Sequence, residues 1–374
     1  MTAVDVRGTC TGLPAGGFHR LCVGSLDTET GGHLPAVELA YETWGTLNAE
    51  GTNAVLVLHA LTGDTHVAAH RQDPSTGWWD ELVGPGRAVD TDRWFVVAPN
   101  MVGGCSGSTG PASPAPDGRP WGSRFPFITL RDAVEAEARL ADHLGIARWH
   151  AAIGGSMGGA RALEWAVSRP DRVAGVGVLA STAHSSAEQI AFAQAQAQAI
   201  RLDPQFRGGD YYGGPQPEAG LGIARRIAHI TYRSAEELAV RFGRRHQGEE
   251  DPFGTAAGER LGRYQVESYL DHQASKLVGR FDANAYLTLT EALMSHDVGR
   301  GRGGVAEALR RFTGGAFVAA VESDRLYLPA ESHELAALLP ARPQVHMIDS
   351  PLGHDGFLVH YGQVAEQLRQ DLAL

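Results

Sequence analysis

The chain has 374 residues, of which 43% are hydrophobic and 20% are charged, and its formal net charge is −11. This length suffices for one large domain with an insertion or for two ordinary domains, and the apolar fraction is typical of a folded globular protein. Because the chain is acidic and its lysines and arginines form no cluster, we expect neither a nucleic-acid partner nor an anionic membrane partner.

The three cysteines form no CxxC pair, so the sequence predicts neither a disulfide framework nor a metal site built on them. They are Cys10, Cys22 and Cys105. Residues 1–8 lack a basic start followed by an apolar run, which argues against a signal peptide. No run of about 18 apolar residues occurs, so no membrane span is expected. We therefore expect a reduced, cytoplasmic protein.

Two kinds of strand are predicted in chain order. Segments 20–28 and 36–43 alternate apolar and polar residues, as half-buried antiparallel strands do. Further along the chain, short continuous runs of β-branched and aliphatic residues predict strands that are buried on both faces of a parallel sheet. These runs are 53–58, 94–98, 150–153, 173–179, 316–321 and 345–348.

Helical patterns lie between the buried runs. Segment 130–144 repeats apolar residues at three- and four-residue spacing, and segment 160–168 ends just before Pro170, where a helix must stop. Alternation of strands and helices predicts an α/β fold with a mostly parallel central sheet and helices on both faces.

A helical insertion is expected between strands 173–179 and 316–321. It begins with the helix-forming stretch 185–200, and glycine-rich breaks follow at 208–214 and 247–258. Such an insertion usually covers the C-terminal edge of the strands, where ligands of α/β folds bind. The predicted division is a core of residues 1–182 and 299–374 and an inserted helical lid of residues 183–298.

The segment Gly154–Gly159 places the pattern G-x-S-x-G between a predicted strand and a predicted helix. Glycines flank the serine because side chains there would obstruct the strained turn that carries a nucleophile. The turn would expose the Ser156 hydroxyl and aim the Met157 amide at the oxygen of a bound carbonyl. A chain with 47 glycines can produce this string by chance, but the strand before it and the helix after it favour a nucleophile.

A serine nucleophile needs a base, and the base needs an orienting carboxylate. Asp324 follows the predicted strand 316–321 and His354 follows 345–348, in the chain order that this fold requires. Either residue alone could be an ordinary loop residue, and Glu322 competes with Asp324 as the acid. Their order and their common sheet edge favour catalytic roles.

Two glycine-rich loops complete the predicted site. The loop after strand 53–58 normally supplies the second oxyanion donor, which we assign to the Leu61 amide. In that loop we interpret His59 as a structural residue and not as a base. The loop 100–110 could cradle phosphate or simply turn, and no base is placed to make Cys105 a nucleophile.

Motifs along most of the chain, from about 35 to 358, resemble the homoserine O-acetyltransferase family. The motifs in the insertion are far more specific than G-x-S-x-G. The resemblance implies an α/β-hydrolase core whose helical lid also makes a homodimer. It implies transfer of acetyl from acetyl-CoA to L-homoserine, in methionine synthesis, with no metal or prosthetic group. The motifs are 58–64, 103–113, 154–159, 199–204, 208–212, 224–234, 264–270, 280–287 and 353–358.

By motif position, the resemblance also implies how the amino-acid substrate is held. Arg225 matches the arginine that binds the substrate carboxylate, and the neighbouring Arg226 is the competing candidate. Tyr232 matches a tyrosine near the substrate, and Asp355 matches the acid that receives the amino group. The departure is Ser106, where relatives carry a larger residue. For the acyl transfer itself, the resemblance implies the same residues that the fold pattern selected. They are the nucleophile Ser156, its partners Asp324 and His354, and the oxyanion donors Leu61 and Met157.

Other functions of the same scaffold stay open. The donor could be succinyl-CoA and the acceptor L-serine, because no residue pattern decides the acyl length. The chain could also be a serine esterase that transfers its acyl group to water. A binding module without catalysis is disfavoured, because all three positions of the triad are filled.

Overall fold

The computed structural model describes residues 16–256 and 259–374, so Cys10 and residues 1–8 lie outside the described part. The core is an eight-stranded sheet in the order β1-β4-β8-β5-β9-β10-β13-β14. Each predicted buried run forms a strand of this sheet. In the sheet order given, every strand from β8 onward runs parallel to its neighbours. The strands are β1 (Gly17–Cys22), β4 (Glu38–Trp44), β5 (Ala54–Leu58), β8 (Phe95–Pro99), β9 (Trp149–Gly155), β10 (Val173–Leu179), β13 (Gly315–Val321) and β14 (Val345–Ile348).

The first two strands are antiparallel, as predicted, but two details of the prediction are wrong. The strand predicted over 20–28 ends at Cys22, because Gly24 has a φ of 87° and breaks the ladder. The strand β4 is not half-buried: Glu42 and Thr43 are buried together with its apolar residues. It lies inside the sheet, between β1 and β8, and both of its faces are covered.

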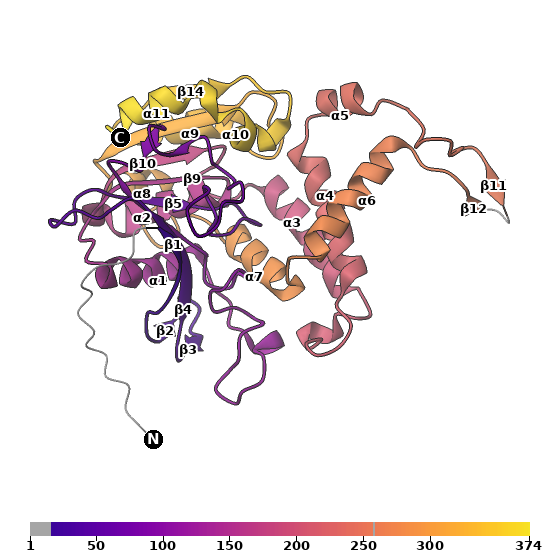
Figure 1. The fold of residues 1–374 in the computed structure, drawn as a ribbon, viewed down its shortest axis with the longest axis horizontal. Coiled ribbons are helices and arrows are strands. Elements are labelled where there is room, and N and C mark those ends of the chain that lie inside the picture. Colours follow the sequence, from indigo (N-terminus) through magenta and orange to yellow (C-terminus); the bar gives the residue numbers. More distant parts are fainter. Residues whose placement is uncertain (1–15, 257–258) are drawn as a thin grey trace.

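Alternate residues of the central strands enter two separate cores, one on each face of the sheet. In β5, Leu56 and Leu58 pack into the first core, whereas Val55 and Val57 pack into the second. The first core is covered by α1 (Leu130–His143), α2 (Met157–Ser168), α8 (Val305–Leu309) and α9 (Pro329–Leu338). The second is covered by α10 (Gly356–Val359) and α11 (Ala365–Asp371). Helices therefore lie on both faces (Figure 1).

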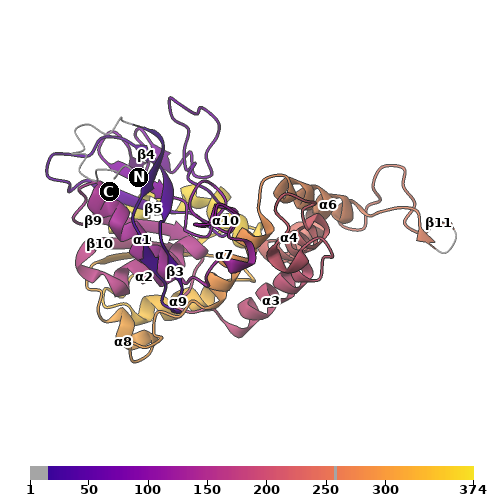
Figure 2. The same cartoon turned by 90° about the horizontal axis from the view of Figure 1, so that it is seen from below.

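The predicted insertion is helical and projects from one end of the core in both views (Figures 1 and 2). Helix α7 lies between the sheet and the other inserted helices, and a thin hairpin extends beyond them. The predicted helix 185–200 is α3, which begins after Ser186, whose hydroxyl accepts a hydrogen bond from the Gln189 amide. The inserted elements are α3 (Ala187–Arg201), α4 (Glu218–Tyr232), α5 (Ala235–Arg241), α6 (Gln265–Val278), α7 (Ala283–Met294), β11 (Thr255–Ala256) and β12 (Glu259–Arg260).

Two further pairs of short strands lie at the edges of the core. They are β2 (Leu26–Asp27) with β3 (His33–Leu34), and β6 (Val83–Gly84) with β7 (Val89–Asp90). Within residues 16–256 and 259–374, no helix combines the length and the apolar character that crossing a bilayer requires.

Candidate active site

Ser156 stands on the sharp turn between β9 and α2. Its φ of 55° and ψ of −126° are strained for a residue with a side chain, which is typical of a nucleophile turn. The glycines on either side of Ser156 are required because other parts of the chain pack directly against their Cα atoms. A Cβ on Gly155 would lie 2.2 Å from the Phe357 ring, and one on Gly158 would lie 2.0 Å from the Leu58 carbonyl oxygen. Helix α2 starts at residue 157 and not at 160, because it begins directly after this turn.

The structure brings Asp324 and His354 into contact. The Asp324 carboxylate lies 2.6 Å from Nδ1 of His354, and its other oxygen accepts hydrogen bonds from the amides of Leu326 and Tyr327 at 2.8 and 2.9 Å. Glu322, the competing acid, is exposed. Since the carboxylate accepts, Nδ1 carries the proton and Nε2 is the basic nitrogen. Both His354 and Ser156 line the same cavity.

The pKa of His354 stands above its ordinary value of 6.5. Burial by itself would lower this pKa, because it disfavours the imidazolium. The Asp324 charge and hydrogen bond outweigh burial, and the Asp355 charge adds to them. The imidazole is therefore a stronger base than an unperturbed histidine.

The amides of Leu61 and Met157 are available for an oxyanion. Neither donates to an acceptor in the described part of the chain, and Met157 is the first residue of α2, where the helix dipole favours negative charge. His59 holds the Leu61 loop: its Nδ1 donates to the Ala60 carbonyl at 2.7 Å, and its Nε2 accepts from the Met101 amide at 3.0 Å. Burial lowers the pKa of His59 to about 3, so this histidine is neutral and structural, as predicted.

A cavity of about 260 Å³ opens above Ser156. Of the two candidate arginines, Arg225 lines this cavity, whereas Arg226 points to α6 and pairs with Asp271 at 2.8 Å. The family motif favoured Arg225, but no local pattern separated the two, because adjacent helix positions differ only in the direction that they face. The predicted residues that line this cavity are Leu61, Ser156, Arg225, Tyr232, His354 and Asp355.

The charges in this cavity are of both signs. The Arg225 guanidinium lies 5.8 Å from the centre of the Tyr232 ring and 3.5 Å from the Thr62 hydroxyl, and its buried Nε has no partner in the described structure. Asp355 faces Arg233 at 3.3 Å, and burial raises the pKa of Asp355 above its ordinary value despite that neighbour. The cavity can therefore hold a ligand that carries both a carboxylate and an ammonium group.

The prediction missed two arginines at this site. Arg280 lines the cavity and donates to the Thr62 carbonyl at 3.0 Å, and Arg233 is the partner of Asp355. Both belong to motifs that the sequence analysis selected as whole segments, 280–287 and 224–234. The resemblance selected only Arg225 from these segments, and no local pattern indicated Arg233 or Arg280, because the packing of the inserted segment places them.

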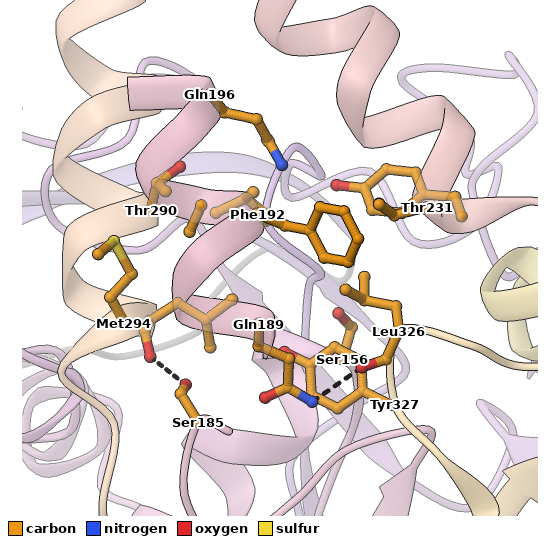
Figure 3. A pocket seen from close by; sticks show the side chains of 14 residues that line it. Ser156, Ser185, Gln189, Phe192, Gln196, Thr231, Thr290, Met294, Leu326 and Tyr327 are labelled. Carbon is orange, nitrogen blue, oxygen red and sulfur yellow. Dashed lines mark hydrogen bonds between the residues drawn. The ribbon is translucent and has the colours of Figure 1, made fainter. Parts of the chain in front are cut away.

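A second, smaller cavity of about 50 Å³ shares three lining residues with the first, Leu61, Ser156 and Tyr232. Helices α3 and α7 form much of its wall. Figure 3 shows Ser156 at one end of this cavity and Gln196 and Thr290 toward the other. It is lined by Leu61, Ser156, Ser185, Gln189, Phe192, Ala193, Gln196, Thr231, Tyr232, Thr290, Leu293, Met294, Leu326 and Tyr327, none of which carries a charge.

Glu42, His66 and His70 form a cluster whose ligand atoms lie close enough to hold a metal ion. Their hydrogen bonds are already made: both histidines lie 2.9 Å from the same Glu42 oxygen, and the second His66 nitrogen lies 2.9 Å from the Ser75 carbonyl. These bonds raise the pKa of His66 against the effect of burial. The cluster supports the loop that carries Trp78 to the active-site cavity.

Cys105 lies in the glycine-rich loop, outside both cavities at Ser156. Burial raises the pKa of its thiol to about 11, so the thiolate form is scarce at neutral pH. This environment is the opposite of the one that activates a cysteine nucleophile, in agreement with the prediction.

Known proteins share this architecture. Residues 53–361 match the alpha/beta hydrolase fold family, which confirms the predicted fold class. A curated relative from Thermobifida fusca (strain YX), named homoserine O-acetyltransferase, is 59% identical over 352 residues, covering 93% of this chain and 91% of the relative. Solved homoserine O-acetyltransferase from Bacillus anthracis superposes with a TM-score of 0.88 at 26% identity, covering 97% of this chain and 99% of that one. Esterase E22 superposes with a TM-score of 0.87 at 25% identity, covering 96% and 100%.

Proposed function

The chain belongs to the homoserine O-acetyltransferase family, and from this premise we propose that it moves an acetyl group from acetyl-CoA to the hydroxyl of L-homoserine through an acyl-Ser156 intermediate. One observation carries the proposal beyond the family name. The cavity that holds Ser156 and His354 is lined by two arginines and two carboxylates, and of these Arg225 and Asp355 match the two charges of an amino acid.

The proposed reaction has two steps. In the first, Nε2 of His354 takes the Ser156 proton while Oγ attacks the thioester carbon. The C–S bond breaks, and CoA leaves as a thiol with the proton from His354. The Leu61 and Met157 amides stabilise the oxyanion in this step.

In the second step, homoserine replaces CoA in the large cavity. Arg225 binds its carboxylate, Asp355 receives its ammonium group, and the side-chain hydroxyl is thereby aimed at the acetyl carbon. His354 takes the proton of this hydroxyl, the new ester bond forms, and the Oγ–carbon bond to Ser156 breaks. The proton then returns from His354 to Ser156, so the enzyme is regenerated without a metal or prosthetic group.

Hydrolysis is the second candidate function, because esterase E22 shares the fold almost as closely as the solved acetyltransferase does. The charged pair Arg225 and Asp355 favours transfer, because an esterase that uses water needs no site for a zwitterion. Holding an alcohol in place at the acyl-enzyme lowers the activation free energy of transfer by several kcal/mol, because it raises the effective concentration of the alcohol. This is enough to compete with water.

Steady-state rates with pairs of donors and acceptors test the proposal. We expect CoA release to require both acetyl-CoA and L-homoserine, and we expect O-acetyl-L-homoserine as the product. L-serine in place of homoserine, and simple esters in place of acetyl-CoA, serve as the comparison substrates. Rapid ester hydrolysis that homoserine does not change would support the esterase instead, and activity only with another donor or acceptor would overturn the proposed pair.

We predict that Arg225→Ala raises the KM for homoserine by roughly 100-fold, because it removes the cation that holds the substrate carboxylate. Acylation of Ser156 by acetyl-CoA should change much less, since acetyl-CoA brings no carboxylate for Arg225 to bind. Arg226→Ala is the matched control: it deletes the neighbouring guanidinium, which pairs with Asp271 outside the cavity. Equal loss in both half-reactions of Arg225→Ala, or an equal effect of Arg226→Ala, would contradict the assignment.

We further propose that residues 183–298 act as a lid and as the interface of a homodimer. The lid exposes large apolar side chains on α4, on α5 and in the loops next to the β11–β12 hairpin, and exposed apolar side chains that lie together are typical of an interface. They are Ile223, Ile230, Val240, Phe253 and Leu261. Light scattering should give twice the 39.8 kDa of one chain, and a mass of one chain would exclude the dimer.

A further inference from the structure

Ser156 lies where two cavities of different character meet. The large cavity is lined in part by Arg225, Arg280 and Asp355, so it presents charges of both signs beside His354. The small cavity is lined by uncharged side chains throughout. A charged cavity suits a charged substrate, and an uncharged cavity suits an apolar group. The two cavities are therefore suited to different parts of the reacting molecules.

The geometry at the acyl carbon divides the two cavities between the substrates. In the acyl-enzyme this carbon is bound to Oγ of Ser156, to the carbonyl oxygen and to the alkyl chain. The oxygen is directed to the Leu61 and Met157 amides, and the acceptor must approach from the large cavity, where Arg225 and Asp355 would hold it. The small cavity is left for the alkyl chain. This step rests on the proposed acyl transfer.

We infer that the small cavity is the acyl pocket and that it admits short linear uncharged acyl groups, propionyl and butyryl as well as acetyl, while excluding acyl groups with a terminal carboxylate. Its volume of about 50 Å³ exceeds the need of one methyl group. A water-sized group needs about 10–15 Å³ on this measure, so the pocket has room for roughly three to five such groups.

Charge decides against a carboxylate in this pocket. Away from Ser156 the pocket presents Gln196 and Thr290, which are both neutral and buried (Figure 3). The Gln196 carbonyl oxygen accepts a hydrogen bond from the Tyr286 hydroxyl at 2.5 Å, and the Thr290 hydroxyl has no partner in the described structure, so both residues can offer a ligand only neutral donors. A succinyl carboxylate would therefore be buried without a cation, and an unpaired buried charge is costly.

Acylation of Ser156 by acetyl-, propionyl-, butyryl- and succinyl-CoA, without homoserine, tests the inference by mass spectrometry of quenched mixtures. We expect the three uncharged groups to acylate the wild type and succinyl to react on the order of 100-fold more slowly than butyryl. Succinylation within about threefold of butyrylation would overturn the inference. No acylation by any donor would instead refute the proposed function, so the two failures are distinguishable.

Two substitutions in the pocket wall sharpen this test. Ala193→Leu on α3 fills the pocket, so it should lower butyrylation at least about tenfold relative to acetylation. Met294→Ala enlarges the pocket and should allow hexanoyl-CoA to react. Ala195→Leu is the control, because it makes the same change on the exposed side of α3. Circular dichroism checks that each variant is folded. Equal loss of acetylation and butyrylation in folded Ala193→Leu, with no gain in Met294→Ala, would contradict the assignment.

Discussion

Ser156→Ala should reduce kcat for acetyl transfer by roughly 10⁴–10⁶-fold while the protein stays folded. The loss is this large because the variant has no oxygen that can carry the acetyl group between the two steps. The backbone of residue 156 has a φ of 55°, which costs alanine about as much as serine, so the turn should survive. The measurement is the steady-state rate together with circular dichroism and thermal unfolding.

The control for this variant is Ser168→Ala, which makes the same change at the last residue of α2. The Ser168 hydroxyl bonds to Glu164 and lies outside both cavities. We expect that variant to keep its kcat. Residual transfer within about tenfold of the wild type in Ser156→Ala, or loss of secondary structure, would show that the serine is structural and not the nucleophile.

Asp324→Asn should reduce kcat by about 10³–10⁴-fold and also change the pH dependence. An asparagine can hold the imidazole in the wrong tautomer, and it no longer stabilises the imidazolium. In the wild type, the raised pKa of His354 means that the base is protonated, and activity lost, as the pH falls through a value above 6.5. In the variant, burial acts on His354 without the Asp324 charge, so its pKa and this acid limb should move to lower pH.

The pH profile of kcat/KM separates this role from a purely structural one. Glu322→Gln is the matched control, because Glu322 is an exposed acid two residues away that does not contact His354. It should leave both kcat and the acid limb unchanged. A full kcat with an unmoved acid limb in Asp324→Asn would contradict the assignment of Asp324 as the orienting carboxylate.

The sequence predicted the positions of the three triad candidates better than the residues that line the cavity around them. Ser156, Asp324 and His354 were placed correctly relative to the sheet because each follows a continuous buried strand, and the C-terminal ends of parallel strands meet at one edge. The signal is local: a run of aliphatic residues followed by a polar loop. The same reasoning erred at β4, where buried polar residues such as Glu42 imitate the pattern of a half-exposed strand.

The contributions of the inserted helical segment could not be derived from local patterns. Arg225 and Arg226 are equivalent in propensity and charge, and only the packing of α4 against α6 directs one to the cavity and the other to Asp271. Arg280 reaches the cavity because the segment before α7 contacts the Thr62 loop of the core, more than 200 positions earlier in the chain. Such contacts depend on the relative placement of the lid and the sheet, which no sequence window contains.

The central claim is that Ser156 carries the acetyl group, and mass spectrometry of the protein mixed with acetyl-CoA alone tests it most directly. We predict a mass increase of about 42 Da on the peptide that contains Ser156, its loss when L-homoserine is added, and the appearance of O-acetyl-L-homoserine. The Ser156→Ala variant should show no such adduct. An adduct on another residue such as Cys105, or product formation with no acyl-Ser156 under conditions that trap acyl-enzymes, would contradict the account.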